Sequence, residues 1–207
     1  GFLSQASAQY DDWKHSGLTY LVTDSAGADL PASAVEKNFP LLIRLNKEYF
    51  DFTQPKDGGE DVRFSSKGKP LAYQIERWDT KGGEADIWVR IPTIKGKDQQ
   101  AIKMHWGNEK VSSESTGEQV FRTTERFAAV WHLGDSLEDA TANNLDGVNR
   151  PDKPTVNTTG IIGDAQEFGV NQILVIRPPG AKPGRRVTCM PSGNADRTMS
   201  AWVNPTS

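Results

Sequence analysis

The stretch Ala85-Asp86-Ile87-Trp88-Val89-Arg90-Ile91 alternates apolar and polar side chains without a break. Successive side chains of a β-strand point to opposite faces, so this stretch predicts a strand with one core face and one polar face that carries Trp88. Short apolar runs separated by turns continue on both sides, and none shows helical periodicity over three turns. The chain is therefore predicted to be all-β, with less than about a tenth helix. The expected strands are 18–22 at an edge, 41–45, 62–64, 71–78, 85–91 and 101–106.

These strands are expected to close a β-sandwich by about residue 121. Its predicted core follows from the alternation of the strands and consists of Tyr73, Ile75, Ile87, Val89, Ile43 and Met104.

Residues 71–78 and 85–91 are expected to pair as a hairpin with its turn centred on Gly82. Glu76 then lies opposite Trp88, and the outward face carries a patch of Gln74, Glu76, Trp78, Trp88 and Arg90. Exposed Trp rings beside planar polar groups suit sugar binding, since a ring stacks on the pyranose while the polar groups bond its hydroxyls. The alternative, favoured because Trp is highly buried on average, is that a second sheet, the N-terminal segment or the next domain covers this patch.

The numbers of charged residues limit the kinds of partner that the protein can bind. The 207 residues include 24 Lys and Arg and 27 Asp and Glu, scattered along the chain, which argues against nucleic acid or an anionic membrane surface as the main partner. No apolar run approaches the ~20 residues that span a bilayer, so no membrane insertion is expected. Cys189 is the only cysteine; it excludes an intrachain disulfide and is expected to be a buried, inert thiol.

Residues 1–8, Gly-Phe-Leu-Ser-Gln-Ala-Ser-Ala, have the small residues at alternate positions that signal peptidase requires. They are interpreted as the remnant of a signal peptide, with Gln9 as the mature N-terminus, and they predict an exported protein that is periplasmic, at the cell surface or secreted. The alternative is an N-terminal segment that happens to be rich in Ala and Ser.

A second pattern follows the first module. Residues 9–121 form the expected sandwich and the polar residues 122–128 a linker. Residues 129–207 hold the next expected strands, at 129–133, 166–168, 173–176 and 198–203.

Residues 10–121 resemble the domain-of-unknown-function 2341 family through Trp13 and, in order, the motifs PLLIRL, GEDVRF, LAYQIERWD, ADIWVRIP and KMHWGN. The resemblance implies an exported, multidomain bacterial protein, commonly with a laminin-G-like domain next to this one. Some members form the extracytoplasmic part of MotA/TolQ/ExbB-type proton channels. The family has no established catalytic residues.

Residues 129–207 resemble the start of a laminin-G-like, concanavalin A-like jelly roll, through VWHLGDSLEDATANNLDG, GIIGDAQEFGVNQILV and TMSAWVNP. Two packed sheets of this kind need about 150 residues, so roughly half of the jelly roll is expected to be missing. The apolar residues of this partial domain are then expected to be less buried than those of the first module: Phe168, Ile173, Val175, Met199, Ala201 and Trp202.

One loop of the second part is dense in oxygen ligands, with Asp135, Asp139, Asn143, Asn144 and Asp146 before Gly147. Ca²⁺ takes six to eight such oxygens, so calcium is a candidate cofactor that would brace the loop. Asn, Asp and Gly are also the usual residues of tight turns, and structural turn chemistry is the favoured alternative.

Carboxyl pairs for glycoside hydrolysis can be formed from Glu60 with Asp61 or from Glu76 with Asp86. The Glu-x-Asp-x-x-Glu signature of glucanases with a similar fold does not occur, and the three histidines lack metal-ligand spacing. We therefore expect a non-catalytic, extracytoplasmic binding module of a larger exported bacterial protein, with polysaccharide or a surface protein as its partner. The alternative is a periplasmic sensory or structural ectodomain of a MotA/TolQ/ExbB-type biopolymer-transport protein.

Overall fold

The structure is a computed structural model that describes residues 9–177 and 189–205. Strands make up 39% of it and helices 4%, which confirms the prediction of an all-β protein with little helix. The chain divides between Val120 and Phe121 into two compact units. Residues 1–8, interpreted above as a signal-peptide remnant, lie outside the described residues.

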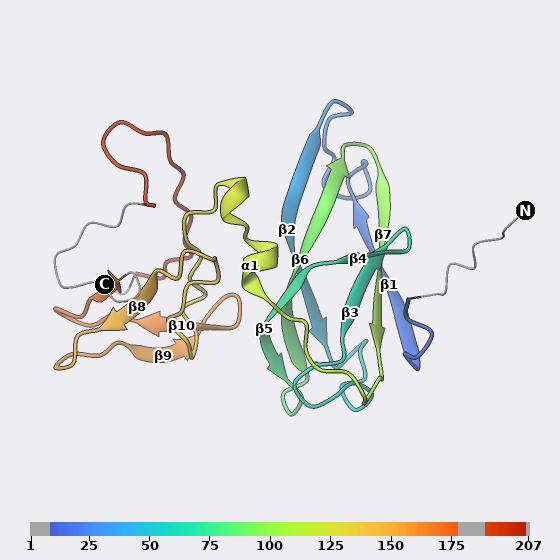
Figure 1. Ribbon diagram of the computed structural model, residues 1–207, viewed down its shortest axis with the longest axis horizontal. Coiled ribbons are helices and arrows are strands. Elements are labelled where there is room, and N and C mark those ends of the chain that lie inside the picture. Colours follow the sequence, from blue (N-terminus) through green and yellow to red (C-terminus); the bar gives the residue numbers. More distant parts are fainter. Residues whose placement is uncertain (1–8, 178–188, 206–207) are drawn as a thin grey trace, which may run out of the picture. The chain divides into compact units, whose positions relative to one another are not determined.

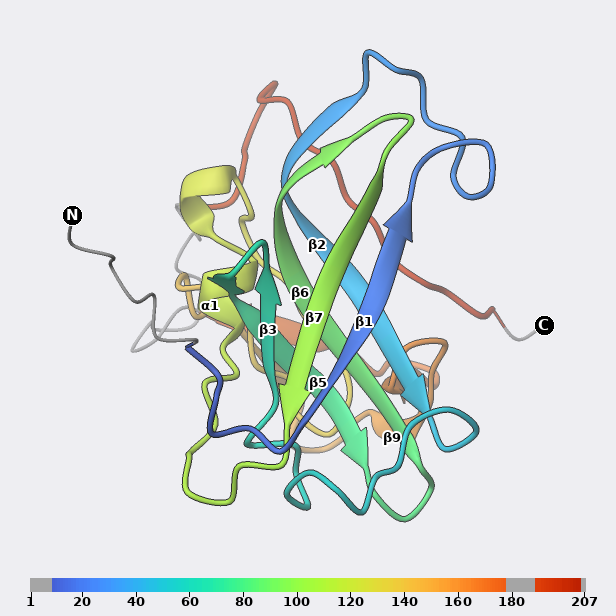
Figure 2. The same cartoon turned by 90° about the vertical axis from the view of Figure 1, so that its right-hand side faces the viewer.

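The first unit is a sandwich of two antiparallel sheets, which Figure 2 shows as two layers crossing each other. One sheet has the order β1-β7-β3-β4, with bounds β1 (His15–Val22), β7 (Gln99–Trp106), β3 (Arg63–Ser66) and β4 (Lys69–Leu71). The other has the order β2-β6-β5, with bounds β2 (Val35–Asn46), β6 (Glu84–Lys95) and β5 (Tyr73–Asp79). The short helix α1 (Gly117–Val120) contacts β5 and β6 on the outer side of this sheet (Figure 1).

The core between the sheets contains the predicted residues. Ile87 and Val89 have no exposed surface, and Tyr73, Ile43 and Met104 are buried beside them. Ile75 is partly buried and packs against the same cluster. Because each fully buried side chain of this size contributes about 1.5–3 kcal/mol, the β6 core face is a large part of the stability of this unit.

The predicted register of the β5–β6 hairpin is wrong. Gln74, not Glu76, pairs with Trp88, and the register shifts between Ile75 and Arg77, so that Trp78 pairs with Ala85. The extra residue at this β-bulge is Glu76. A bulge of one residue reverses the faces beyond it, and Trp78 therefore points into the sandwich instead of out of it.

The second unit contains two small antiparallel sheets among its described residues. β8 (Asp146–Asn149) pairs with β11 (Leu174–Arg177), and β9 (Val156–Thr159) pairs with β10 (Asp164–Glu167). The 3₁₀ helix η1 (Thr123–Glu125) lies in the segment predicted to be a linker.

The strands predicted at 129–133 and 198–203 are not formed. Trp131 makes only an isolated bridge to Asp139, and residues 198–203 have no regular structure. A strand persists only where a neighbour takes up its backbone hydrogen bonds, and no described residue does so here. The strands expected at 173–176 and 166–168 correspond to β11 and to the end of β10, which stops one residue before Phe168.

Of the six apolar residues of the second unit that were predicted to be poorly buried, five are exposed and Val175 is half-buried, whereas Leu145, which was not among them, is fully buried. Phe168 and Ile173 are about half exposed, whereas Met199 and Trp202 are 90% and 75% exposed. Cys189 is also exposed, so the expectation of a buried thiol is wrong. The reason is local, because residues 191–205 are exposed throughout and form no core that could enclose it.

Candidate functional site

Four residues of the predicted sugar-binding patch lie together on the outer face of the β2-β6-β5 sheet. Gln74 opposes Trp88, and the Trp88 indole Nε1 donates to Glu76 Oε2 at 2.5 Å, while Arg90 follows on the same face of β6. All four are half-buried, each has a partner within the protein, and α1 packs on the two strands that carry them. The patch is thus half-buried, and covering by a second sheet, the N-terminal segment or the next domain stays a prediction.

Trp78 does not belong to this patch. Its ring packs edge-on against Phe50 and Phe52, with ring centroids 6.1 and 5.3 Å away, and its Nε1 donates to Thr80 Oγ1 at 3.2 Å. Gly59 lies directly on the ring: it has φ 70°, and a Cβ there would be 2.6 Å from Trp78 Cε3. The bulge at Glu76 therefore converts a predicted ligand contact into a core residue at one end of the sandwich.

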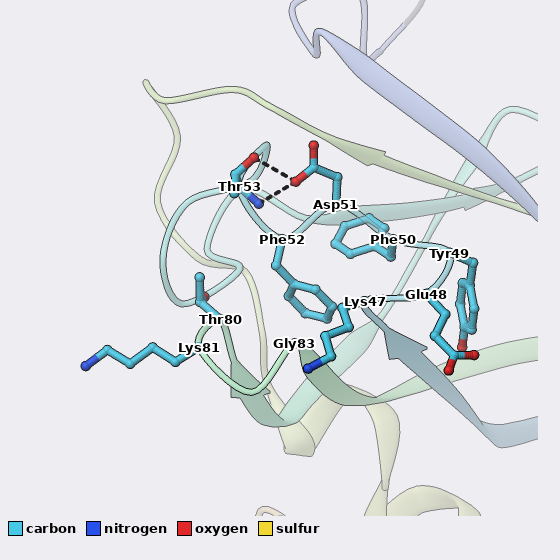
Figure 3. Close-up of a pocket in the computed structure, with 10 residues that line it drawn as sticks. All are labelled: Lys47, Glu48, Tyr49, Phe50, Asp51, Phe52, Thr53, Thr80, Lys81 and Gly83. Carbon is cyan, nitrogen blue, oxygen red and sulfur yellow. Dashed lines mark hydrogen bonds between the residues drawn. The ribbon is translucent and has the colours of Figure 1, made fainter.

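At this end of the sandwich an open hollow of about 500 Å³ lies between two loops (Figure 3). One loop is Lys47–Thr53, directly after β2, and the other is the β5–β6 turn with Thr80, Lys81 and Gly83. Phe50 and Phe52 line the hollow and are otherwise buried in the core, whereas the Tyr49 side chain is 64% exposed. The sequence pattern did not predict this hollow, although Tyr49-Phe50-Asp51-Phe52 places three aromatic residues just after a strand.

Hydrogen bonds within the loop hold the Tyr49 ring in place. The Tyr49 hydroxyl donates to the Arg44 carbonyl at 2.6 Å, and the Asn46 side chain accepts from the Glu48 backbone N–H at 2.9 Å. The Lys47 N–H donates to the Gly83 carbonyl at 2.8 Å and joins the two loops. The ring is therefore both exposed and oriented before any ligand arrives.

The polar side chains around the hollow include positively and negatively charged groups. Lys47 and Lys81 are exposed cations, and Glu48 and Asp51 are exposed carboxylates. Asp51 accepts from the Thr53 hydroxyl at 2.7 Å and from the Thr53 N–H at 3.0 Å, and these bonds hold the pKa of Asp51 below its ordinary value. An oriented ring with hydroxyl, ammonium and carboxylate groups around it can bind a polyhydroxylated ligand.

The residues of GEDVRF and KMHWGN meet in a buried polar cluster on the outer side of the other sheet. Asp61 is fully buried, and its carboxylate accepts from the backbone N–H groups of Lys56, Gly107 and Asn108 at 2.8, 2.5 and 2.9 Å. Arg63 donates to the Tyr73 hydroxyl and forms an ion pair with Glu114 at 3.2 Å. These motif residues tie loops to the sandwich, which is a structural role.

Ser65 and His105 form the nearest approach to a nucleophile–base pair, with Oγ and Nε2 2.9 Å apart. Both are buried, and the Tyr10 ring lies over the imidazole at 4.2 Å between centroids, so a substrate has no access. Burial, with the charge of Lys103, lowers the pKa of His105 to about 4. The carboxyl pairs considered above are also engaged, since Asp86 forms an ion pair with Arg44 at 3.2 Å and Glu76 accepts from Trp88.

The oxygen-rich loop of the second unit is organised by its own hydrogen bonds. The Asp139 carboxylate accepts from the N–H groups of Val130, Thr141 and Leu145, each at 3.0 Å, and from the Thr141 hydroxyl at 2.9 Å. Asp146 accepts from the Asp139 N–H at 3.0 Å.

The other three candidate ligands of calcium in this loop are engaged in the same way, and among them Asn144 donates to the Ala142 carbonyl at 3.1 Å. Asn143 donates to the Ala128 carbonyl at 2.8 Å, and Asp135 accepts from the Asn157 amide at 2.5 Å. Within residues 9–177 and 189–205, no group of three or more His, Cys, Asp or Glu side chains could hold a metal ion. The geometry favours turn chemistry over calcium.

The fold and the hollow define the class of protein to which the chain belongs. It is an antiparallel all-β sandwich with an open, aromatic-lined hollow at one end, and a second all-β unit follows it in the sequence. Residues 58–134 match the family described as "Domain of unknown function (DUF2341)". The match includes GEDVRF through KMHWGN and extends past the expected boundary at residue 121 into the second unit.

No curated protein and no solved structure has significant similarity to the chain. The described helices are all too short and too polar to cross a membrane. The resemblance of residues 129–207 to a laminin-G-like domain stays a prediction.

Proposed function

We propose that the chain is a non-catalytic, extracytoplasmic binding module and that the hollow beside Tyr49 recognises glycan. The observation that carries the proposal is the Tyr49 ring, which is 64% exposed, is held by a hydrogen bond to the Arg44 carbonyl, and stands next to an open hollow of about 500 Å³. A fixed aromatic ring stacks on a pyranose with little loss of side-chain entropy. The volume lies within the roughly 300–1,000 Å³ of small-molecule sites.

The charges around the hollow favour a neutral glycan. Lys47 and Lys81 are balanced by Glu48 and Asp51, so the rim presents no excess of either sign. A polyanionic glycan calls for clustered cations, whereas a neutral one needs donors and acceptors that meet its hydroxyl groups. Neutral polysaccharides such as xylan, glucomannan and hydroxyethyl cellulose are the class of ligand that this rim suits.

The resemblances of residues 10–121 and 129–207 to known families suggest the larger protein in which this module would act. A larger exported bacterial protein, in which the second unit begins a laminin-G-like jelly roll, would place two binding modules in series. Recognition of a surface protein, or a sensory role in a MotA/TolQ/ExbB-type complex, requires a protein partner and is the competing function. The exposed Tyr49 favours the glycan, because the groups around it match hydroxyls.

The test is affinity electrophoresis of the 207-residue chain in gels that contain each neutral polysaccharide. Tyr49→Ala should raise the dissociation constant obtained from the retardation about two- to tenfold, because stacking of an aromatic ring contributes about 0.5–1.5 kcal/mol beyond the area it buries. Tyr49→Phe should retain most of the binding, since it keeps the ring and loses only the bond to the Arg44 carbonyl.

Phe39→Ala is the matched control, because Phe39 is an exposed aromatic of β2 outside the hollow. It should leave retardation unchanged. Trp88→Phe tests the alternative patch on the sheet face. Wild-type protein that is not retarded by any polysaccharide, or retardation that Tyr49→Ala leaves intact, would exclude glycan recognition at this hollow.

A further inference from the structure

The two sheets of the sandwich have four edges, and an edge strand presents unpaired backbone groups that invite another strand. Proteins that stay monomeric protect such edges with charged residues, proline, irregular backbone, very short strands or a covering segment. The edges are β1 and β4 in one sheet and β2 and β5 in the other. An edge strand that lacks all of these features is the one open to pairing with another strand.

Three edges are protected. The edge strand β2 contains Glu36, Lys37 and Pro40, and its extended backbone is interrupted at Asn38, which has φ 56°. The edge strand β4 has only three residues, two of which are Lys69 and Pro70.

The third protected edge, β5, is covered by the segment that leads into α1. The Thr116 N–H donates to the Tyr73 carbonyl at 2.9 Å, and the Ile75 N–H donates to the Ser115 hydroxyl at 2.8 Å. This segment takes the place that an added strand would occupy.

The fourth edge, β1, has none of these devices. Its eight residues, HSGLTYLV, include no Pro, Lys, Arg, Asp or Glu. Leu18 and Tyr20 stand on its outer face and are 55% and 58% exposed. A long, uncharged edge strand with exposed apolar side chains is a pairing site.

The hydrogen bonds at the end of β1 show which of its backbone groups face the open edge. The Thr23 N–H donates to the Asp98 carbonyl, on the side of β7, whereas the Val22 carbonyl accepts from the Ala28 N–H on the opposite side. These directions alternate along an antiparallel strand, so Ser16, Leu18 and Tyr20 direct their backbone groups to the open edge. No described residue bonds these groups, and the turn at Asp24–Ala28 closes the edge at Val22.

We infer that β1 pairs with β1 of a second copy of this chain, antiparallel, with Leu18 opposite Leu18. This register pairs Ser16 of each copy with Tyr20 of the other, so every backbone group that faces the open edge gains a partner and Val22 is not needed. The alternative register centred on Thr19 requires the Val22 carbonyl, which Ala28 already occupies.

The charges next to β1 do not oppose this pairing. The paired segment from Ser16 to Tyr20 is uncharged, so it brings no like charges together. The charged residues beyond it have partners within each copy, since Lys14 forms an ion pair with Glu109 at 2.9 Å and Asp24 accepts from the Gln99 amide at 2.8 Å.

Disulfide trapping tests the register in the full 207-residue chain with Cys189→Ser, which removes the exposed native thiol. Leu18→Cys should form a covalent dimer on mild oxidation, because residues opposite each other in a hydrogen-bonded pair have Cα atoms about 5.5 Å apart, within the disulfide range. Tyr20→Cys, on the same face, is the matched control: it lies opposite Ser16 and should form no covalent dimer. The combined Ser16→Cys and Tyr20→Cys variant should crosslink again.

Sedimentation velocity tests the interface without a crosslink. Leu18→Lys places two cations together at the symmetry axis and should convert dimer to monomer, while Val156→Lys, at a similarly exposed apolar residue of β9, should leave the dimer intact. If two copies instead associate through the exposed second unit, the dimer should persist in Leu18→Lys. Leu18→Cys should then form no disulfide in preference to Tyr20→Cys. That result would overturn the inference. So would a wild-type chain that stays monomeric at 100 µM, or one whose β1 pairs only with an added strand from another protein.

Discussion

At the scale of single residues, the outer face of the β1-β7-β3-β4 sheet depends on His105 being neutral. Its imidazole forms a hydrogen bond with Ser65 and lies under the Tyr10 ring, so it links the N-terminal segment to the sheet. Burial disfavours the protonated form and the charge of Lys103 adds to this effect, which together lower the pKa of His105 to about 4.

This lowered pKa predicts how stability changes with pH. In the unfolded chain His105 titrates near its ordinary pKa of 6.5 and in the folded protein near 4, so the unfolded state binds more protons between these values. The free energy of unfolding should therefore be independent of His105 above pH 6.5, and should fall as the pH drops from 6.5 to about 4. Urea unfolding followed by tryptophan fluorescence at several pH values measures this slope.

His105→Gln is the control for that measurement, since an amide can still bond Ser65 but does not titrate. The slope between pH 6.5 and 4 should become flatter in this variant. The carboxylates of Asp24, Asp51, Asp79 and Glu109 accept hydrogen bonds that lower their pKa values below 3.8 or 4.5, so their contribution is lost at lower pH. An unchanged slope in His105→Gln would assign the effect to another group.

At the scale of elements, alternation predicted β6 and its faces, because a strand buried on one side must repeat with period two. Ile87 and Val89 are fully buried and Trp88 lies on the other face, as expected. The bulge at Glu76 was not predictable, since one inserted residue has no characteristic sequence, and it moved Trp78 to the core. The hollow was missed for a related reason: it depends on two loops that only the paired strands bring together.

The face assignment of β6 can be tested by a charge on its core side. Ile87→Asp should prevent folding, because Ile87 has no exposed surface and an unpaired buried carboxylate is costly. Lys95→Asp, at the exposed end of the same strand, should leave the free energy of unfolding within about 0.5 kcal/mol. Circular dichroism and thermal melting distinguish the two, and a soluble, cooperatively melting Ile87→Asp protein would contradict the assignment.

At the scale of the whole molecule, the two units differ in how well they bury their apolar side chains. The first has a continuous core between its sheets, from Ile43 to Met104. The second has two sheets of two strands each among its described residues, and side chains such as Phe168, Met199 and Trp202 are exposed. Two-stranded sheets are marginal in water without further packing. The contrast was expected from the resemblance of residues 129–207 to a laminin-G-like domain, and that resemblance stays a prediction.

Amide hydrogen exchange of the full chain turns this contrast into a measurement. Protection follows the free energy of local opening, which is large where backbone hydrogen bonds lie in a packed core and small where they are exposed. Residues 40–106 should therefore exchange slowly, since β2, β6 and β7 enclose the buried cluster. The described residues from 129 to 203 should exchange fast, because β8 to β11 pair only as two-stranded sheets and none of their described side chains is fully buried. Equal protection in both halves would mean that residues 129–207 form a self-sufficient domain, and the interpretation of this part as an incomplete laminin-G-like jelly roll would then have to be abandoned.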